Sequence, residues 1–353
     1  MYKRQIPGYE DFLQNASFVS LARAAQQHPI VALVASKNLS YALIILEDAQ
    51  CTLVTLEKAT DMALKTFSHR IKTHSRDVRS RGVRKVHTSQ TRPTDVYREL
   101  WTAVMLPIVN ALGWPVSLAA TGLLTLLTPL QKVHGRSRRR LTLCPTGIFM
   151  QLPLHVAGIY MGADQACCSD YFGSTYIPSI GALLHAQQTF KPIRRVDADM
   201  LVVAVERPFE GIALPSTTTE ANLIRSLVSP SATVAEAARS EDVLEQIQSA
   251  PILHMACHGT QDLKNALESG FLLEDTLLPV SKLMQLELPQ AFLAILSACE
   301  TAKGDAAQPD QAIHLAATML FAGFKSVVAT MWCVRAYMHD RAPDDALQVH
   351  AGP

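Results

Sequence analysis

Three short apolar runs in the second half of the chain constrain the fold more than any other feature. They begin at Ile252, Leu293 and Lys325, and each ends abruptly in polar or reactive residues. Runs of this length with polar boundaries are typical of buried strands. A helix-like segment separates the second run from the third, and strands that alternate with helices form parallel sheets joined by crossover helices. We therefore expect an α/β fold with a mostly parallel β-sheet flanked by helices.

Two reactive side chains follow the first two predicted strands. His258 comes at the end of the first run, and Cys299 comes at the end of the second. Ligand sites of open parallel sheets lie beyond the carboxyl ends of the strands, so we expect both side chains at the same edge. A thiolate is the nucleophilic form of cysteine, and an imidazole beside it can take the thiol proton. The pair therefore predicts a cysteine nucleophile and its base.

The strings around these two residues resemble a known family. Ala256-Cys257-His258-Gly259 and Leu296-Ser297-Ala298-Cys299-Glu300-Thr301-Ala302 resemble the caspase-like cysteine peptidases, and within that clan the CHAT domain (caspase and HetF associated with TPRs). Residues 311–316 and 322–332 are also similar to CHAT domains, especially to fungal members.

The resemblance implies a caspase-like sheet preceded by a smaller α+β subdomain. It implies a cysteine endopeptidase, a hydrolase in which the backbone N–H groups of Gly259 and Cys299 form the oxyanion hole. It further implies an enzyme held latent until it is activated, in regulated proteolysis or cell-death-like signalling. The alternative is an inactive interaction or scaffold module that keeps the peptidase fold.

We predict two parts in the chain. Residues 1–140 form the N-terminal α+β subdomain of the CHAT region, and residues 141–353 form the caspase-like peptidase domain. Within the first part, the apolar runs 30–35, 41–46 and 51–56 predict an antiparallel meander. By comparison with the family, the closing helices after Trp332 are missing, so we expect a C-terminally truncated domain.

A basic segment and an apolar segment stand out in the first part. Residues 73–93 are polar and basic with little to bury, and we expect a loop there. Residues 101–131 carry no charged side chain and no histidine, which would suit a membrane span. Prolines and glycines interrupt this stretch, however, so we favour a buried helix followed by an apolar loop. A membrane-anchored variant stays open as an alternative.

The apolar spacing before Gly113 predicts the face of that buried helix. Val96, Leu100, Val104 and Ile108 recur every four residues, as on one side of an α-helix.

Two further local predictions bear on the site. Residues 141–155 contain a strand, a Pro/Gly turn and a second apolar run, which is a hairpin pattern. Thr217 and Glu220 have the spacing of a capping box and predict the start of a helix that runs through Leu227.

We expect neither a metal nor another cofactor. His254, Cys257 and His258 could suggest zinc, but the His-x-x-x-His spacing suits one face of a helix, whereas this run reads as a strand. Cys257 is also a rival nucleophile, but alternation along a strand turns it away from the face of His258.

An acidic substrate pocket would need carboxylates near Cys299. The candidates are Glu300, Asp310 and Asp262, each of which could equally be a solvated loop charge.

Cysteine usage and charge indicate the cellular compartment and bear on nucleic-acid binding. The seven cysteines are an odd number without framework spacing, which favours reduced thiols in a cytoplasmic protein. Residues 65–92 carry nine Lys/Arg against one acid, but they lack the interleaved aromatic residues of a nucleic-acid site. We therefore expect no nucleic-acid partner. The resemblance to CHAT domains implies a protein or peptide substrate and a regulatory partner such as a TPR protein.

Overall fold

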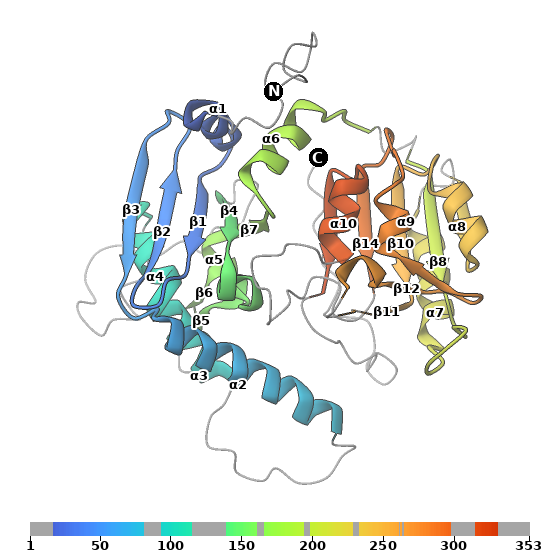
Figure 1. Ribbon diagram of the computed structural model, residues 1–353, viewed down its shortest axis with the longest axis horizontal. Helices are drawn as coiled ribbons and strands as arrows, with labels where there is room; N and C mark the ends of the chain where they lie inside the picture. The colour runs from blue at the N-terminus through green and yellow to red at the C-terminus, as the bar shows by residue number, and fades with distance from the viewer. Residues whose placement is uncertain are drawn as a thin grey trace. The chain divides into compact units, whose positions relative to one another are not determined.

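The computed structural model describes residues 17–80, 93–114, 139–160, 166–193, 198–228, 233–260, 262, 265–297 and 315–330. The chain divides into two compact units (Figure 1). Unit 1 comprises residues 1–67, 90–149 and 154–189, and unit 2 comprises residues 68–89, 150–153 and 190–353.

Unit 1 is built on a mixed sheet. Its described strands lie in the order β3 (Cys51–Leu56), β2 (Ser40–Ile45), β1 (Ile30–Val34), β4 (Arg139–Pro145) and β7 (Phe172–Tyr176). The antiparallel pairing of β1, β2 and β3 confirms the predicted meander. β4 and β7 add to it as parallel strands. The predicted boundary between residues 140 and 141 falls within β4, which pairs inside this sheet.

Short helices complete unit 1. They are α1 (Phe18–Ala22), η2 (Arg23–Ala25), α3 (Pro93–Leu100), η3 (Trp101–Met105), α4 (Leu106–Ala111), η5 (Gly147–Gln151), η6 (Leu154–Val156), α5 (Cys168–Tyr171) and α6 (Ile180–Gln188), with the small strands β5 (Gly158–Ile159) and β6 (Ala166–Cys167).

The helix predicted before Gly113 is present as α3, η3 and α4 in succession. The four residues of its predicted face, Val96, Leu100, Val104 and Ile108, are all buried, which confirms the expectation. The middle segment is a π-helix that ends at Met105, two residues before Pro107, whose ring removes a backbone donor.

Two local predictions are wrong. The helix α2 (Asp61–Ser80) continues through the first eight residues of the predicted basic loop, and residues 81–92 lie outside the described part. Its buried residues Leu64, Phe67 and Ile71 have helical spacing, which gives the helix an apolar face. The hairpin predicted at 141–155 is also absent, because β4 is followed by the 3₁₀ segments η5 and η6. β4 already has β1 and β7 on its two edges, so no edge remains for a hairpin partner.

Unit 2 contains the predicted parallel sheet. Its described strands lie in the order β15 (Ser326–Ala329), β14 (Leu293–Leu296), β10 (Ile252–Ala256), β8 (Met200–Ala204) and β9 (Val234–Ala237), and every neighbouring pair is parallel. The three apolar runs of the sequence are β10, β14 and β15. This confirms the α/β fold with a mostly parallel sheet.

Helices flank this sheet. Residues 201, 203, 253, 255, 294 and 296 form one buried cluster with side chains of α8 (Ser240–Gln246), α9 (Val280–Leu283) and α10 (Leu315–Ala322). The helix α7 (Ser216–Leu227) contacts β8 and β10. A small antiparallel sheet of β11 (His258–Thr260), β12 (Gly270–Leu272) and β13 (Leu277–Pro279), with the short η8 (Ala266–Glu268), follows β10 directly.

Within the parts of the chain that the structure describes, no helix has the length and apolar character needed to cross a membrane. Residues 115–131 of the apolar stretch lie outside those parts.

Candidate active site

His258 lies two residues beyond the end of β10 and begins β11. Its side chain is half-buried, and its Nε2 atom lies 2.7 Å from the carbonyl oxygen of Ile212. A carbonyl oxygen can only accept a hydrogen bond, so Nε2 carries the hydrogen and donates it. In the neutral imidazole the lone pair is then on Nδ1. The ring is therefore oriented with its basic nitrogen away from Ile212.

The loop after β8 holds the Ile212 carbonyl in place. The Leu214 N–H donates to the Glu206 carbonyl at 2.8 Å, which closes the loop at its base. The Phe209 N–H donates to the Leu273 carbonyl at 2.9 Å, which ties the loop to the end of β12. The main-chain partner of His258 thus belongs to a segment held by these two main-chain hydrogen bonds.

Gly211 fits this loop for a steric reason. Its φ angle is +101°, a backbone conformation that side chains with a Cβ rarely adopt. A Cβ added there would also lie 3.9 Å from Cδ2 of His258. The glycine therefore lets the backbone turn beside the imidazole.

The strand register gives the relation between the two predicted catalytic positions. In the pairing of β10 with β14, Ile252 lies beside Leu293 and Met255 lies beside Leu296, so paired residues differ by 41 in number. His258 and Cys299 also differ by 41 in number. Cys299 itself lies outside the described residues, as do Glu300 and Asp310. Ser297 is the last described residue before it.

A polar network lies beneath this edge of the sheet. His254, which is buried in β10, lies with Nε2 2.9 Å from Oε1 of Glu220 on α7. A carboxylate only accepts, so His254 donates this bond. The Ser297 side chain, directly after β14, also helps to lower the pKa of Glu220. The Glu220 carboxylate thus joins α7 to the middle of β10.

The network keeps Glu220 ionised. Burial by itself would raise the pKa of this carboxyl. The hydrogen bond from His254, the Ser297 side chain and the attraction of the His254 ring outweigh burial and lower the pKa below its ordinary value of 4.5.

The predicted capping box on α7 is wrong. Because the spacing assigned Glu220 to that cap, its hydrogen bond with His254 was not predicted. Thr217 Oγ1 donates to the Leu214 carbonyl at 2.9 Å instead of accepting a backbone N–H of its helix. Glu220 is turned toward His254 instead of back to the helix start. The sequence signal was the helical position of Glu220 between Thr217 and Ala221, which are both buried. The Ile212 carbonyl had no signal in the sequence, because a main-chain partner leaves no side-chain pattern.

Cys257 does not have the properties of a nucleophile. Its side chain is buried, and burial raises the pKa of its thiol well above the ordinary range, so the thiol stays protonated at neutral pH. Gly259 lies in β11 beside Phe271 of β12. Its part in an oxyanion hole stays a prediction.

Asp262 is exposed and is used in a turn. Its Oδ1 accepts the Asn265 N–H at 3.0 Å, and its own N–H donates to Ser269 Oγ at 2.9 Å. Its part in a substrate pocket stays a prediction.

A metal site built on the two histidines finds no support in the described ranges. No group of three or more His, Cys, Asp or Glu side chains there is arranged to hold a metal ion. His254 and His258 instead donate to separate partners, Glu220 and Ile212.

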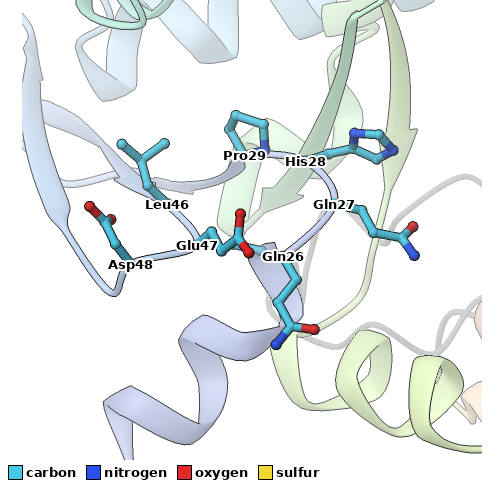
Figure 2. A pocket seen from close by; sticks show the side chains of 8 residues that line it. Gln26, Gln27, His28, Pro29, Leu46, Glu47 and Asp48 are labelled. Atoms are coloured by element: carbon cyan, nitrogen blue, oxygen red, sulfur yellow. The ribbon is translucent and has the colours of Figure 1, made fainter.

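An open hollow of about 410 Å³ lies in unit 1, on other elements than His258 (Figure 2). It is lined by residues 25–29 and 46–48, which include the side chains of His28, Glu47 and Asp48. Burial, followed by the nearby Arg140, lowers the pKa of His28. No cysteine is among its lining residues, so this hollow offers none of the predicted chemistry.

Comparisons with known proteins identify the family and the fold. The sequence model of the CHAT domain matches residues 94–341. No curated protein matches the chain in sequence. A chain of the Saccharomyces cerevisiae separase–securin complex is similar in structure, with a TM-score of 0.55 at 10% sequence identity. The match covers 90% of this chain and 27% of that one, and at this identity it shows a shared fold.

Proposed function

The chain belongs to the CHAT domain family, and from this premise we propose that it is a cysteine endopeptidase that acts through His258 and Cys299. The observation that carries the proposal is the hydrogen bond from His258 Nε2 to the Ile212 carbonyl, at the carboxyl end of the strand beside β14. It fixes a ring whose free nitrogen can act as a base, as a peptidase histidine requires. The shared spacing of 41 residues supports Cys299 as its partner.

The proposed reaction begins with proton transfer. Nδ1 of His258 takes the proton of the Cys299 thiol, and the thiolate attacks the carbonyl carbon of the scissile peptide bond. A C–S bond forms while the carbonyl electron pair moves to oxygen. The backbone N–H groups of Gly259 and Cys299 are the proposed donors to this oxyanion.

Collapse of the tetrahedral intermediate breaks the C–N bond. The proton held on Nδ1 goes to the leaving amine, which leaves an acyl-enzyme thioester. Water then gives a proton to His258 and attacks the thioester, which releases the acid and restores the thiol. Throughout, the Nε2 bond to Ile212 stabilises the imidazolium by placing a carbonyl dipole against its positive charge.

The proposal also names a class of substrate and a mode of regulation. The substrate is a protein or peptide, and Asp262, Glu300 and Asp310 are the proposed acids near its binding site. We propose that the enzyme is latent until a protein partner or proteolysis activates it, in regulated proteolysis or cell-death-like signalling. A TPR protein is one such partner, and a cytoplasmic setting suits the unpaired thiols.

Site-by-site thiol reactivity tests the proposal. The full chain is treated with a peptide-like electrophile between about pH 5 and 9, and each of the seven cysteines is quantified by mass spectrometry. Selective labelling of Cys299 near neutral pH, lost in His258→Ala, is the expected result.

Uniform labelling of all exposed cysteines, unchanged by His258→Ala, would refute the proposal of a peptidase. The inactive interaction module with a peptidase fold would then be the better account. A matched control is His155→Ala, because His155 is a half-buried histidine whose Nδ1 lies 3.0 Å from the Tyr176 hydroxyl in unit 1. It should leave the labelling of Cys299 unchanged.

A further inference from the structure

The strand β3 lies at one end of the sheet in unit 1 (Figure 1). Among the strands that the structure describes, only β2 pairs with it, so its outer side faces no other strand there. Four of its six residues are exposed, and Leu53 is 62% exposed. We call this outer side, along residues 51–56, the β3 edge. Such an edge presents unpaired N–H and C=O groups to an incoming strand.

The hydrogen-bond pattern shows which residues carry these outward groups. Next to the turn, the Leu46 N–H donates to the Gln50 carbonyl at 3.0 Å, so these two residues form a hydrogen-bonded pair. Hydrogen-bonded and non-hydrogen-bonded pairs alternate along an antiparallel ladder. Cys51, Leu53 and Thr55 therefore direct their N–H and C=O groups outward, whereas the residues between them bond to β2.

The β3 edge lacks the features that usually keep sheet edges from pairing. Natural edge strands carry charged residues or proline, or are covered by other elements. Residues 51–56 contain neither a charged residue nor a proline, and their threonines and valine favour strand pairing. By contrast, β9 at one end of the sheet in unit 2 carries Glu236, which forms an ion pair with Arg225. The β3 edge is therefore suited to accept another strand.

We propose that the β3 edge joins two copies of this chain. The two β3 strands pair antiparallel, with Leu53 of each copy at the two-fold axis, and the two sheets of unit 1 become one continuous sheet. The occupant is a second copy and not an unrelated peptide, because the edge is complementary to itself. This inference concerns unit 1 and does not depend on the proposed peptidase reaction.

The self-complementarity follows from the spacing of the outward groups. In this register Leu53 pairs with Leu53 of the second copy, and Cys51 pairs with Thr55 of the second copy. Every outward N–H then meets an outward C=O, because the outward residues lie symmetrically about Leu53. A shift by one residue would set these groups against residues whose own N–H and C=O already bond to β2. A contact between identical patches of this kind is what a two-fold dimer requires.

Charges at the strand ends favour the same register. Asp48 lies in the turn before β3, and Lys58 follows the other end of the strand. Antiparallel pairing about Leu53 brings Asp48 of one copy opposite Lys58 of the other, since both are equally far from Leu53 in sequence. Opposite charges therefore meet at both ends of the paired strands, which selects a register and a partner more than it adds affinity.

Sedimentation equilibrium of the full chain measures this association. Stable dimers bury about 1,200 Å² or more, and a single strand edge buries less, so we expect a Kd on the order of 10 µM. The weight-average mass should rise from the 38.6 kDa of one chain toward twice that value between about 1 and 100 µM.

Charge variants at the two-fold axis test the register. Leu53→Lys sets two like charges directly opposite each other and should raise the Kd at least about tenfold, and Leu53→Glu should do the same. An equimolar mixture of the two variants should restore association to within about threefold of the unmodified chain, because lysine then faces glutamate. The matched control is Leu223→Lys on α7, where the leucine is 48% exposed, and it should leave the Kd unchanged.

Amide hydrogen exchange resolved to single residues locates the contact. The outward amides of Leu53 and Thr55 should exchange more slowly as the protein concentration rises. The amides of Thr52 and Val54 bond to β2, so they should be protected at every concentration.

Four results would overturn the proposal. A chain that stays monomeric at about 100 µM has no such dimer, and protection of the Leu53 amide in that monomer would show that another segment of the same chain covers the edge. A dimer that Leu53→Lys leaves unchanged must use another surface. Variants that fail to associate when mixed rule out Leu53 at the axis, and a dimer with unprotected Leu53 and Thr55 amides rules out the edge. None of these results bears on the peptidase, which rests on His258 and Cys299.

Discussion

Gly270 should be one of the least replaceable residues of the candidate site. It lies in β12 opposite Pro279 of β13, while the other side of β12 pairs with β11, which carries His258. A Cβ at this position would lie 2.8 Å from the carbonyl carbon of Leu278 and 2.9 Å from Cα of Pro279, and nearer still to the Leu278 carbonyl oxygen. Carbon atoms normally approach to about 3.5 Å, and these are backbone atoms that cannot rotate away.

The expected magnitude for Gly270→Ala follows from this overlap. Overpacking alone costs about 1–3 kcal/mol. Separating β12 from β13 to relieve it also loses ladder hydrogen bonds of about 1 kcal/mol each. We therefore expect the free energy of unfolding of unit 2 to fall by about 3 kcal/mol, which is a urea midpoint lower by about 1.5 M for a slope near 2 kcal/mol per M.

Urea denaturation read by hydrogen exchange reports each unit separately. Peptides from 252–296 follow unit 2, and peptides from α6 follow unit 1. The control is Gly181→Ala, where the nearest atom to the added Cβ is Ser179 Oγ at 4.0 Å and a helical alanine should stabilise by up to about 1 kcal/mol. A midpoint for Gly270→Ala within about 0.3 M of the unmodified chain would refute the steric reasoning.

Three further predictions concern the surroundings of the site. Since the folded-state pKa of Glu220 lies below 4.5, its contribution to stability is complete above that pH and is lost as the pH falls through the lowered value. The free energy of unfolding, measured with urea, should therefore fall less between about pH 7 and pH 3 in Glu220→Gln than in the unmodified chain, by about 1 kcal/mol at most after allowing for exposure. An equal fall in both proteins would contradict this. Cys257, whose burial raises its thiol pKa, should react with iodoacetamide at least about a hundredfold more slowly than the exposed Cys51, as peptide mapping by mass spectrometry would reveal. Ile212→Ala keeps the main-chain acceptor and should leave the rate of Cys299 labelling by iodoacetamide within about twofold of the unmodified chain. Gly211→Ala, at a φ of +101°, should slow this labelling by about tenfold. Equal rates in the two variants would show that the loop does not orient the imidazole.

The pattern of apolar residues in the sequence identified three strands of unit 2 and one helix of unit 1. The apolar runs at β10, β14 and β15 read as buried strands because a parallel sheet covered on its faces needs near-continuous apolar sequence. The face of Val96, Leu100, Val104 and Ile108 was visible because helical geometry repeats in the sequence itself. The parallel pairing confirms the three strands, and the burial of the four helix residues confirms that face. The strand β15 is the less buried one, with Val328 58% exposed.

Predictions failed where the partner of a residue is distant in the chain. Thr217 and Glu220 have capping-box spacing, yet Glu220 bonds to His254, 34 residues away in sequence. Residues 141–155 have the local pattern of a hairpin, yet β4 inserts between β1 and β7 and leaves no free edge.

The sequence by itself determined the parallel sheet of unit 2, the family, and His258 and Cys299 as the candidate pair, because strand runs and family strings are local properties of a chain. Only the tertiary structure decided which nitrogen of His258 is free, because that depends on the Ile212 carbonyl 46 residues earlier. It also decided that Glu220 accepts a hydrogen bond from His254 instead of capping its helix. The physical reason is that hydrogen bonds form between atoms that folding brings within about 3 Å, whatever their separation along the chain.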